Sequence, residues 1–112
     1  MKQLKIKCWI EEEGEKYYGP GPHELLNQIQ KEGSLSKAAG KMHMSYKKAW
    51  AMVQKLNQFS AEALVILKKG GQDGGGAEVS LYGLEIMKEY DDLQLKVGQL
   101  TVQEEKSLKI LK

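Results

Sequence analysis

Arginine is absent from this chain of 112 residues, in which all seventeen basic residues are lysines. The planar guanidinium group, which can bind a carboxylate, a phosphate or a guanine edge through two parallel hydrogen bonds, is therefore unavailable. Contacts with anions must use single ammonium groups, hydroxyls or backbone amides. The absence restricts the geometry of recognition but leaves attraction to anions intact.

Cysteine and long apolar runs are also scarce. Cys8 is the single cysteine, so no disulfide can form within the chain, which suits a reducing compartment. No uninterrupted apolar stretch approaches the ~20 residues that cross a bilayer. The N-terminus alternates and then becomes acidic, unlike a signal peptide. These features predict a soluble, cytoplasmic protein with no membrane partner.

The lysines are unevenly distributed. Between Lys37 and Gln72 seven lysines face Glu62 alone, a net charge of +6, whereas the remainder carries ten lysines and fourteen acidic residues, a net charge of −4. A basic segment of this kind is typical of a protein that binds a polyanion. Because a chain of this length suffices for one hydrophobic core, we expect a single domain, 1–112, with the binding surface in its middle.

The first nineteen residues predict a β-hairpin. Apolar side chains recur at every second position of 3–10, the period of a half-buried strand, and an acidic turn near Gly14 leads to a short return strand at 16–18. The glycine and proline run at 19–22 is expected to interrupt regular structure. A helix should then span about 22–32 and end at a glycine.

The stretch 33–59 predicts two helices that meet at a tight turn. Ser34 and Ser36 are both candidate N-caps for a first helix of about seven residues. The paired alanines at 38–39 are small enough for the next helix to cross closely, as a helix-turn-helix requires. Met44 is expected to fill the turn.

The second helix of this pair should span about 46–59, with Ser45 as its N-cap. Its inward face is expected to contain Ala49, Val53 and Leu56, joined by Trp50 or Met52. Trp50 could also stack on bases, but a tryptophan beside valine and leucine in a helix is more often a core residue, so we expect it in the core.

Two short strands, at 64–67 and 77–80, flank a basic loop. Lys68 and Lys69 precede five glycines in this loop. A flexible basic hairpin directly after the second helix of a helix-turn-helix is typical of a wing. We therefore expect 64–80 to contact a groove or the backbone of a nucleic acid beside that helix.

The remainder, 81–112, predicts C-terminal helices. A first helix should run from Leu81 to about 97, Gly98 should interrupt it, and Thr101 with Glu104 matches a capping box that would begin a last helix at about 102–111. Such an apolar tail either packs on its own domain or pairs with a second copy, and we expect it to form a homodimer.

At the level of residues, GSLSKAAGKMHMSYKKAWAMVQKLNQ followed by KKGGQDGGGAEVSLYG closely resembles the N-terminal DNA-binding domain of the molybdate-responsive ModE family. The matching features are the GSLS start, the paired alanines, the MSYKKAW segment, the glycine-rich wing and the SLYG helix start. The helix-turn-helix half is shared with regulators of the LysR type, whereas its combination with the glycine wing is specific. The resemblance covers about 3–95.

This resemblance implies a mainly helical α+β fold: a winged helix-turn-helix with an N-terminal β-hairpin at 1–19, a helical core at 22–59, a wing at 64–80 and C-terminal helices. It implies a cytoplasmic transcriptional regulator that binds double-stranded DNA with its recognition helix in the major groove. Full-length members carry further molybdate-binding modules, so no molybdate site and no cofactor are expected within this chain.

The side chains expected to contact DNA lie on both helices of the helix-turn-helix and on the wing. Ser45, Tyr46 and Lys47 are expected to reach base edges, and the lysines to neutralise phosphates. The full set is Ser36, Lys37, Ser45, Tyr46, Lys47, Lys48, Ala51, Lys55, Lys68, Lys69 and Gln72. The alternative is a winged helix that binds another protein, with the surface lysines incidental.

The sequence predicts no catalytic or metal site. The glycine loop has no GK[ST] ending and does not lead from a strand into a helix, so it does not match a phosphate-binding loop. Cys8, His23 and His43 lack the spacing of metal ligands. No nucleophile, base and orienting group can be grouped, and we therefore do not expect an enzyme.

Overall fold

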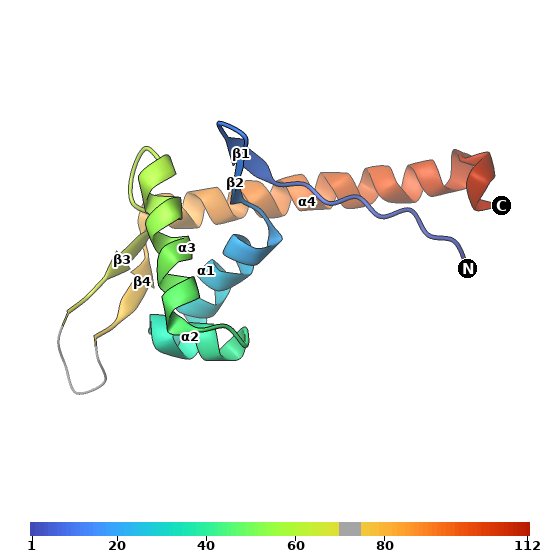
Figure 1. The fold of residues 1–112 in the computed structure, drawn as a ribbon. Helices are drawn as coiled ribbons and strands as arrows, with labels where there is room; N and C mark the ends of the chain where they lie inside the picture. Colours follow the sequence, from blue (N-terminus) through green and yellow to red (C-terminus); the bar gives the residue numbers. More distant parts are fainter. Residues whose placement is uncertain (70–74) are drawn as a thin grey trace.

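The structure, a computed structural model, describes residues 1–69 and 75–112, and within them four α-helices and two antiparallel hairpins follow one another along the chain (Figure 1). The first three helices pack together, one hairpin lies on each side of them, and the fourth helix projects far beyond the rest, so that the molecule measures 58 × 29 × 23 Å. This is the predicted mainly helical α+β architecture of a winged helix-turn-helix. None of the helices in the described residues is long and apolar enough to cross a membrane.

The first hairpin pairs β1, Ile10–Glu12, with β2, Glu15–Tyr18. Glu13 and Gly14 form its two-residue turn with φ angles of 49° and 84°. Positive φ at both central residues gives the backbone twist that a tight hairpin needs, and glycine adopts it without strain.

The predicted strand over 3–10 is wrong, because residues 1–9 form no ladder and instead lie along the fourth helix, α4, Leu81–Ser107 (Figure 1). Side chains of that helix replace a strand partner: the Leu4 N–H donates to Glu105 Oε1 at 3.2 Å, and the Tyr90 hydroxyl donates to the Cys8 carbonyl at 2.8 Å. The alternation therefore places Leu4 and Cys8, both half-buried, toward a helix instead of a sheet.

Helix α1, Pro20–Glu32, begins inside the glycine and proline run that was expected to interrupt regular structure. The run does interrupt regular structure, but only at Gly19, and the helix begins two residues earlier than predicted. Pro20 and Pro22 occupy its first turn, where N–H groups have no acceptor within the helix and their absence costs little. The predicted end is confirmed: Gly33 has a φ of 69°, and its N–H donates to the Ile29 carbonyl at 2.8 Å.

Helices α2, Leu35–Lys41, and α3, Tyr46–Phe59, have the predicted lengths. The second hairpin, β3, Val65–Leu67, and β4, Ala77–Val79, forms the predicted wing. Apolar side chains from α1, α2, α3, the wing strands and α4 share one core with Tyr18 of β2. The predicted inward residues Ala49, Val53 and Leu56 are all buried.

The C-terminal part departs from the prediction of two helices separated at Gly98. α4 is a continuous helix, followed by the short 3-10 turn η1, Lys109–Leu111. A glycine costs a helix interior only about 1 kcal/mol, which its neighbours offset. The expected capping box does not form either, because the Thr101 hydroxyl donates to the Val97 carbonyl at 2.8 Å, a bond made inside a helix.

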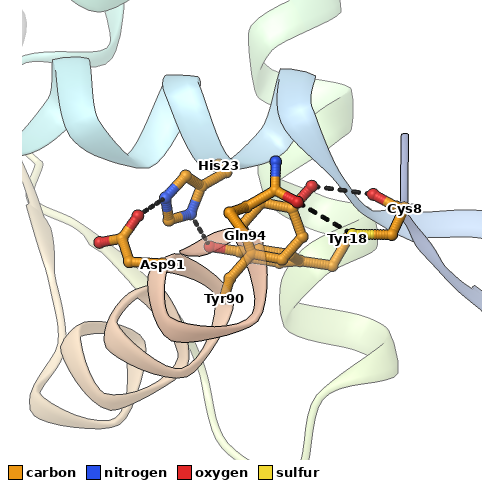
Figure 2. Close-up of polar contacts among 6 residues, drawn as sticks. All are labelled: Cys8, Tyr18, His23, Tyr90, Asp91 and Gln94. Atoms are coloured by element: carbon orange, nitrogen blue, oxygen red, sulfur yellow. Dashed lines mark hydrogen bonds and ion pairs between the residues drawn. The ribbon is translucent and has the colours of Figure 1, made fainter. Parts of the chain in front are cut away.

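A polar network in which Tyr18 and His23 are buried and Asp91 is exposed joins β2, α1 and α4 (Figure 2). His23 lies between two partners: its Nδ1 is 2.6 Å from the Tyr18 hydroxyl and its Nε2 is 2.7 Å from Asp91 Oδ1. Since the carboxylate only accepts, Nε2 carries a proton toward Asp91, and when the ring is neutral Nδ1 accepts from the Tyr18 hydroxyl. Burial, and then the charge of Asp91, raises the pKa of Tyr18, so this hydroxyl stays protonated and donates. Burial also raises the pKa of Tyr90.

Candidate nucleic-acid interface

Each helix of the helix-turn-helix begins at a serine N-cap. The Ser34 hydroxyl accepts from the Lys37 N–H at 3.2 Å and begins α2, and the Ser45 hydroxyl accepts from the Lys48 N–H at 3.0 Å and begins α3. Of the two candidate caps for the first helix, Ser34 is therefore the one used, and Ser36 lies exposed within α2. Both predicted helix starts are confirmed.

One face of α3 is free of the core and reaches solvent. Tyr46 is 53% exposed and Trp50, one turn later, is 45% exposed. The expectation that Trp50 packs in the core is wrong, because Ala49, Val53 and Leu56 already fill the inward face while Met52 packs beside them. Lys47 and Ala51 lie next to the aromatic pair and are also exposed, so the first turns of α3 present aromatic, apolar and basic groups together.

The wing is fixed to α3 through Asn57. Its Oδ1 accepts from the N–H groups of Leu64 and Val65, at 2.8 and 3.2 Å, and its Nδ2 donates to the Val65 carbonyl at 3.0 Å. One side chain thus replaces the strand partner that the outer edge of β3 lacks. The position of the wing relative to α3 follows from this contact.

The wing is also fixed to the turn between α1 and α2. The Ala77 N–H donates to the Gly33 carbonyl at 3.0 Å, and a Cβ at Gly76 would lie 3.3 Å from the same oxygen. At the start of α4, a Cβ at Gly83 would lie 2.5 Å from the Leu64 carbonyl oxygen. Small residues therefore allow α4 and the wing to pack closely on their neighbours.

These attachments bring three elements around one hollow of about 290 Å³. Ser36 lines it from α2, Tyr46 from the start of α3, and Lys68 from the wing. The helix-turn-helix and the wing therefore share a single concave surface, although 22 residues separate Tyr46 from Lys68 in the sequence.

Most predicted contact residues are accessible. Nine are exposed, namely Ser36, Lys37, Ser45, Tyr46, Lys47, Lys48, Ala51, Lys68 and Lys69, whereas Gln72 lies outside the described residues. Lys55 differs, because it is half-buried and its Nζ lies 3.8 Å from Glu15 Oε1 on the first hairpin. The geometry thus directs Lys55 toward β2, away from the hollow.

Two features of this surface escaped the sequence prediction. The exposure of Trp50 could have been predicted, because residues four apart share a helix face and Tyr46 was already expected on the outer face. The role of Asn57 could not have been predicted, because its partners are backbone groups that only the folded wing brings within reach. Among the described residues, no three His, Cys, Asp or Glu side chains gather as metal ligands.

Comparison with known proteins finds several relatives that carry the name ModE. The chain is 38% identical over 72 residues to the molybdenum transport protein ModE of Azotobacter vinelandii, 43% over 67 residues to the transcriptional regulator ModE of Yersinia pestis, and 34% over 89 residues to the DNA-binding transcriptional dual regulator ModE of Escherichia coli. These alignments cover 64%, 60% and 80% of this chain but 27%, 26% and 34% of the relatives, so the chain spans only about a third of their length or less. No protein-family model matches the chain.

Solved structures support the fold alone. A chain from a CbnR_DBD–DNA complex aligns with a TM-score of 0.59 at 15% identity, over 78% of this chain and 94% of that one. A variant of Lactococcus lactis ZitR aligns with a TM-score of 0.58 at 14% identity, over 96% and 73% of the two chains. Together, the sequence relatives and these likenesses confirm the predicted resemblance to the ModE family, over the part of those proteins that the chain matches, and the winged helix-turn-helix fold.

Proposed function

We propose that the chain is a sequence-specific, double-stranded DNA-binding domain of a transcriptional regulator, with α3 in the major groove and the wing on the flanking backbone. The observation that carries the proposal is the shared hollow, where Ser36, Tyr46 and Lys68 come together from the three elements that a winged helix uses on DNA. The domain acts by binding and performs no catalysis itself.

Phosphate contacts come from exposed ammonium groups of α2, α3 and the wing, of which Lys68 lines the hollow. Lys37, Lys48 and Lys69 are exposed, and each can neutralise a phosphate as a point charge. Lys68 lies 3.4 Å from Glu78 across the wing. Exposed pairs of this kind contribute little energy, so Lys68 can exchange the carboxylate for a phosphate.

Base contacts have to be made without arginine. Lys47 can donate to guanine, while Tyr46, Trp50 and Ala51 offer apolar surface. Apolar side chains in the major groove contact the C5-methyl group of thymine. This face of α3 therefore favours sites in which thymine methyl groups point toward the helix.

A homodimer accompanies the proposal. Leu95 and Val102 are 64% and 57% exposed, and a spacing of seven places them on one face of the projecting part of α4. Two recognition helices related by a two-fold axis match half-sites ~34 Å apart. In sedimentation at high concentration we expect a dimer, which Leu95→Glu with Val102→Glu should dissociate; a monomeric native chain would contradict this part of the proposal.

The central test is a double charge reversal. Lys47→Glu with Lys48→Glu should abolish binding to genomic fragments selected by the native chain, because repulsion replaces two attractive contacts. The matched control, Lys88→Glu with Lys96→Glu on α4, makes the same charge change away from the hollow and should retain binding. Equal loss in both variants would indicate a general charge effect, and retained binding in the first would favour the protein-interaction alternative.

A further inference from the structure

A second hollow, of about 260 Å³, lies on the first hairpin, apart from the hollow between α2, α3 and the wing. Its walls include Trp9 and Tyr17 from the hairpin region and Pro20 and Pro22 from the first turn of α1. The same proline run that opens α1 thus supplies flat apolar rings to this surface. The volume is close to the lower end of the range found for small-molecule sites.

Trp9 is held as a rigid wall of this hollow. Lys16 Nζ lies 4.2 Å from the centroid of the indole ring, and the indole Nε1–H donates to Glu11 Oε2 at 2.8 Å. A Cβ at Gly19 would lie 2.8 Å from the Trp9 Cβ, so glycine allows this close approach of the backbone. Trp9 is 41% exposed, while Lys16 holds one face of its ring and Glu11 holds one edge. The ring is therefore pre-organised for contact with a ligand.

The charge on this hollow is positive. Lys7 and Lys16 both line it, and both are exposed. Lys16 and Glu11 are opposite each other in the hairpin, but each side chain contacts Trp9. Two ammonium groups therefore border apolar walls, and the nearby carboxylate of Glu11 is already bonded to the indole.

We propose that this hollow binds a small organic acid that carries an aromatic ring, with its carboxylate at Lys16 and Lys7 and its ring against Tyr17 and the prolines. The apolar walls account for the ring and the two lysines account for the charge. An uncharged aromatic ring of the same size lacks the attraction to the two lysines and binds more weakly.

Occupancy of this hollow reaches the end of α3 through Tyr17. The Tyr17 hydroxyl lies 2.5 Å from the Ser60 hydroxyl, and its ring meets the Phe59 ring edge-on at 5.9 Å. A ligand against Tyr17 therefore contacts the side chain that supports the C-terminal end of the recognition helix. The effect of this link on DNA binding rests on the proposed function, whereas the link itself can be observed without DNA.

The test uses 2-naphthoate and its uncharged analogue 2-naphthamide, titrated into the full chain labelled with nitrogen-15. With 2-naphthoate we expect saturable shifts of the Trp9 indole signal and of amides around the hollow, extending to Phe59 and Ser60. The amide analogue should bind about two- to fivefold more weakly, as expected for the loss of exposed charge contacts.

Lys16→Met keeps the aliphatic stem and removes one of the two charges, and it should weaken 2-naphthoate part of the way toward the level of the amide. Lys5→Met is the matched control, because Lys5 is exposed on the segment that precedes the hairpin but does not line the hollow. Equal binding of the two probes, no effect of Lys16→Met, or shifts centred on α3 and the wing would overturn the proposal. Failure of DNA binding would leave this result unaffected.

Discussion

The Gly33 carbonyl accepts a hydrogen bond of 3.0 Å from the N–H of Ala77, which joins the turn between α1 and α2 to the first residue of β4. With the three bonds of Asn57 to Leu64 and to Val65 of β3, this contact holds both wing strands against the helix-turn-helix. The wing is therefore placed by backbone groups and one amide side chain.

Asn57→Ala should loosen the wing without unfolding the domain. The substitution leaves the half-buried edge of β3 without its partners, which should cost about 1–3 kcal/mol. Faster hydrogen exchange at Leu64 and Val65, with weaker DNA binding, would show the loss of the anchor. Gln58→Ala, an exposed change one residue away, should alter neither; similar behaviour of the two variants would show that Asn57 does not position the wing.

Two glycines of α4 should respond in opposite directions to alanine. At Gly83 a new Cβ would lie 2.5 Å from the Leu64 carbonyl oxygen and 2.6 Å from Val79 Cγ1, so Gly83→Ala should destabilise by about 1–3 kcal/mol. At Gly98 nothing lies within 4 Å, so Gly98→Ala should stabilise by about 0.5–1 kcal/mol. Urea unfolding measures both; a destabilising Gly98→Ala would argue against a continuous α4.

Alkaline pH should weaken the fold through its buried tyrosines. Burial raises the pKa of Tyr18 in the folded chain above the value of about 10 that an unfolded tyrosine has. Unfolding then releases a proton, so this stabilising contribution is complete below pH ~10 and is lost as the pH rises further toward the folded pKa.

Urea midpoints between pH 8 and 11 measure this dependence. Tyr18→Phe should flatten the fall above pH ~10 while lowering stability at neutral pH, because His23 loses its donor. Tyr46→Phe, on the exposed face of α3, is the control and should retain the native dependence. If the stability of Tyr18→Phe fell with pH as steeply as that of the native chain, the fall would not come from the titration of Tyr18.

Trp50→Ala should separate specific from non-specific binding. If the indole contacts thymine methyl groups, its removal should weaken binding to a selected site by about 1–3 kcal/mol, and changing the contacted thymines to uracil should have the same effect in the native chain. Binding to random duplex should persist, since the lysines remain. Trp9→Ala, which removes an exposed tryptophan of the hairpin region, is the control; equal losses in the two variants would contradict the assignment.

The sequence predicts the parts of this fold that depend on local chemistry. Ser34 and Ser45 cap helices as their positions indicate, and Gly33 ends α1. These signals lie within a few residues of the structure they determine, so they can be read from the chain. The helical period likewise identifies the inward residues of α3.

The features that the sequence does not predict depend on partners distant in the chain. Residues 3–10 have the alternation of a strand, but Glu105 and Tyr90 supply their hydrogen-bond partners from α4. Thr101 matches a cap, yet the helix continues through it because packing and propensity on both sides outweigh the cost of Gly98. At the candidate interface, the lysines could be predicted from charge alone, whereas Lys55 turns toward Glu15 only in the folded hairpin.

The salt dependence of binding to a random duplex tests the central claim most directly. In anisotropy titrations from low to moderate salt, log affinity of the native chain should fall linearly with log salt, and Lys48→Gln should make the slope shallower by about 0.9, the value for one lost phosphate contact. Lys96→Gln on α4 should keep the native slope. Absence of binding at low salt, or a slope unchanged by Lys48→Gln, would contradict the placement of α3 on DNA.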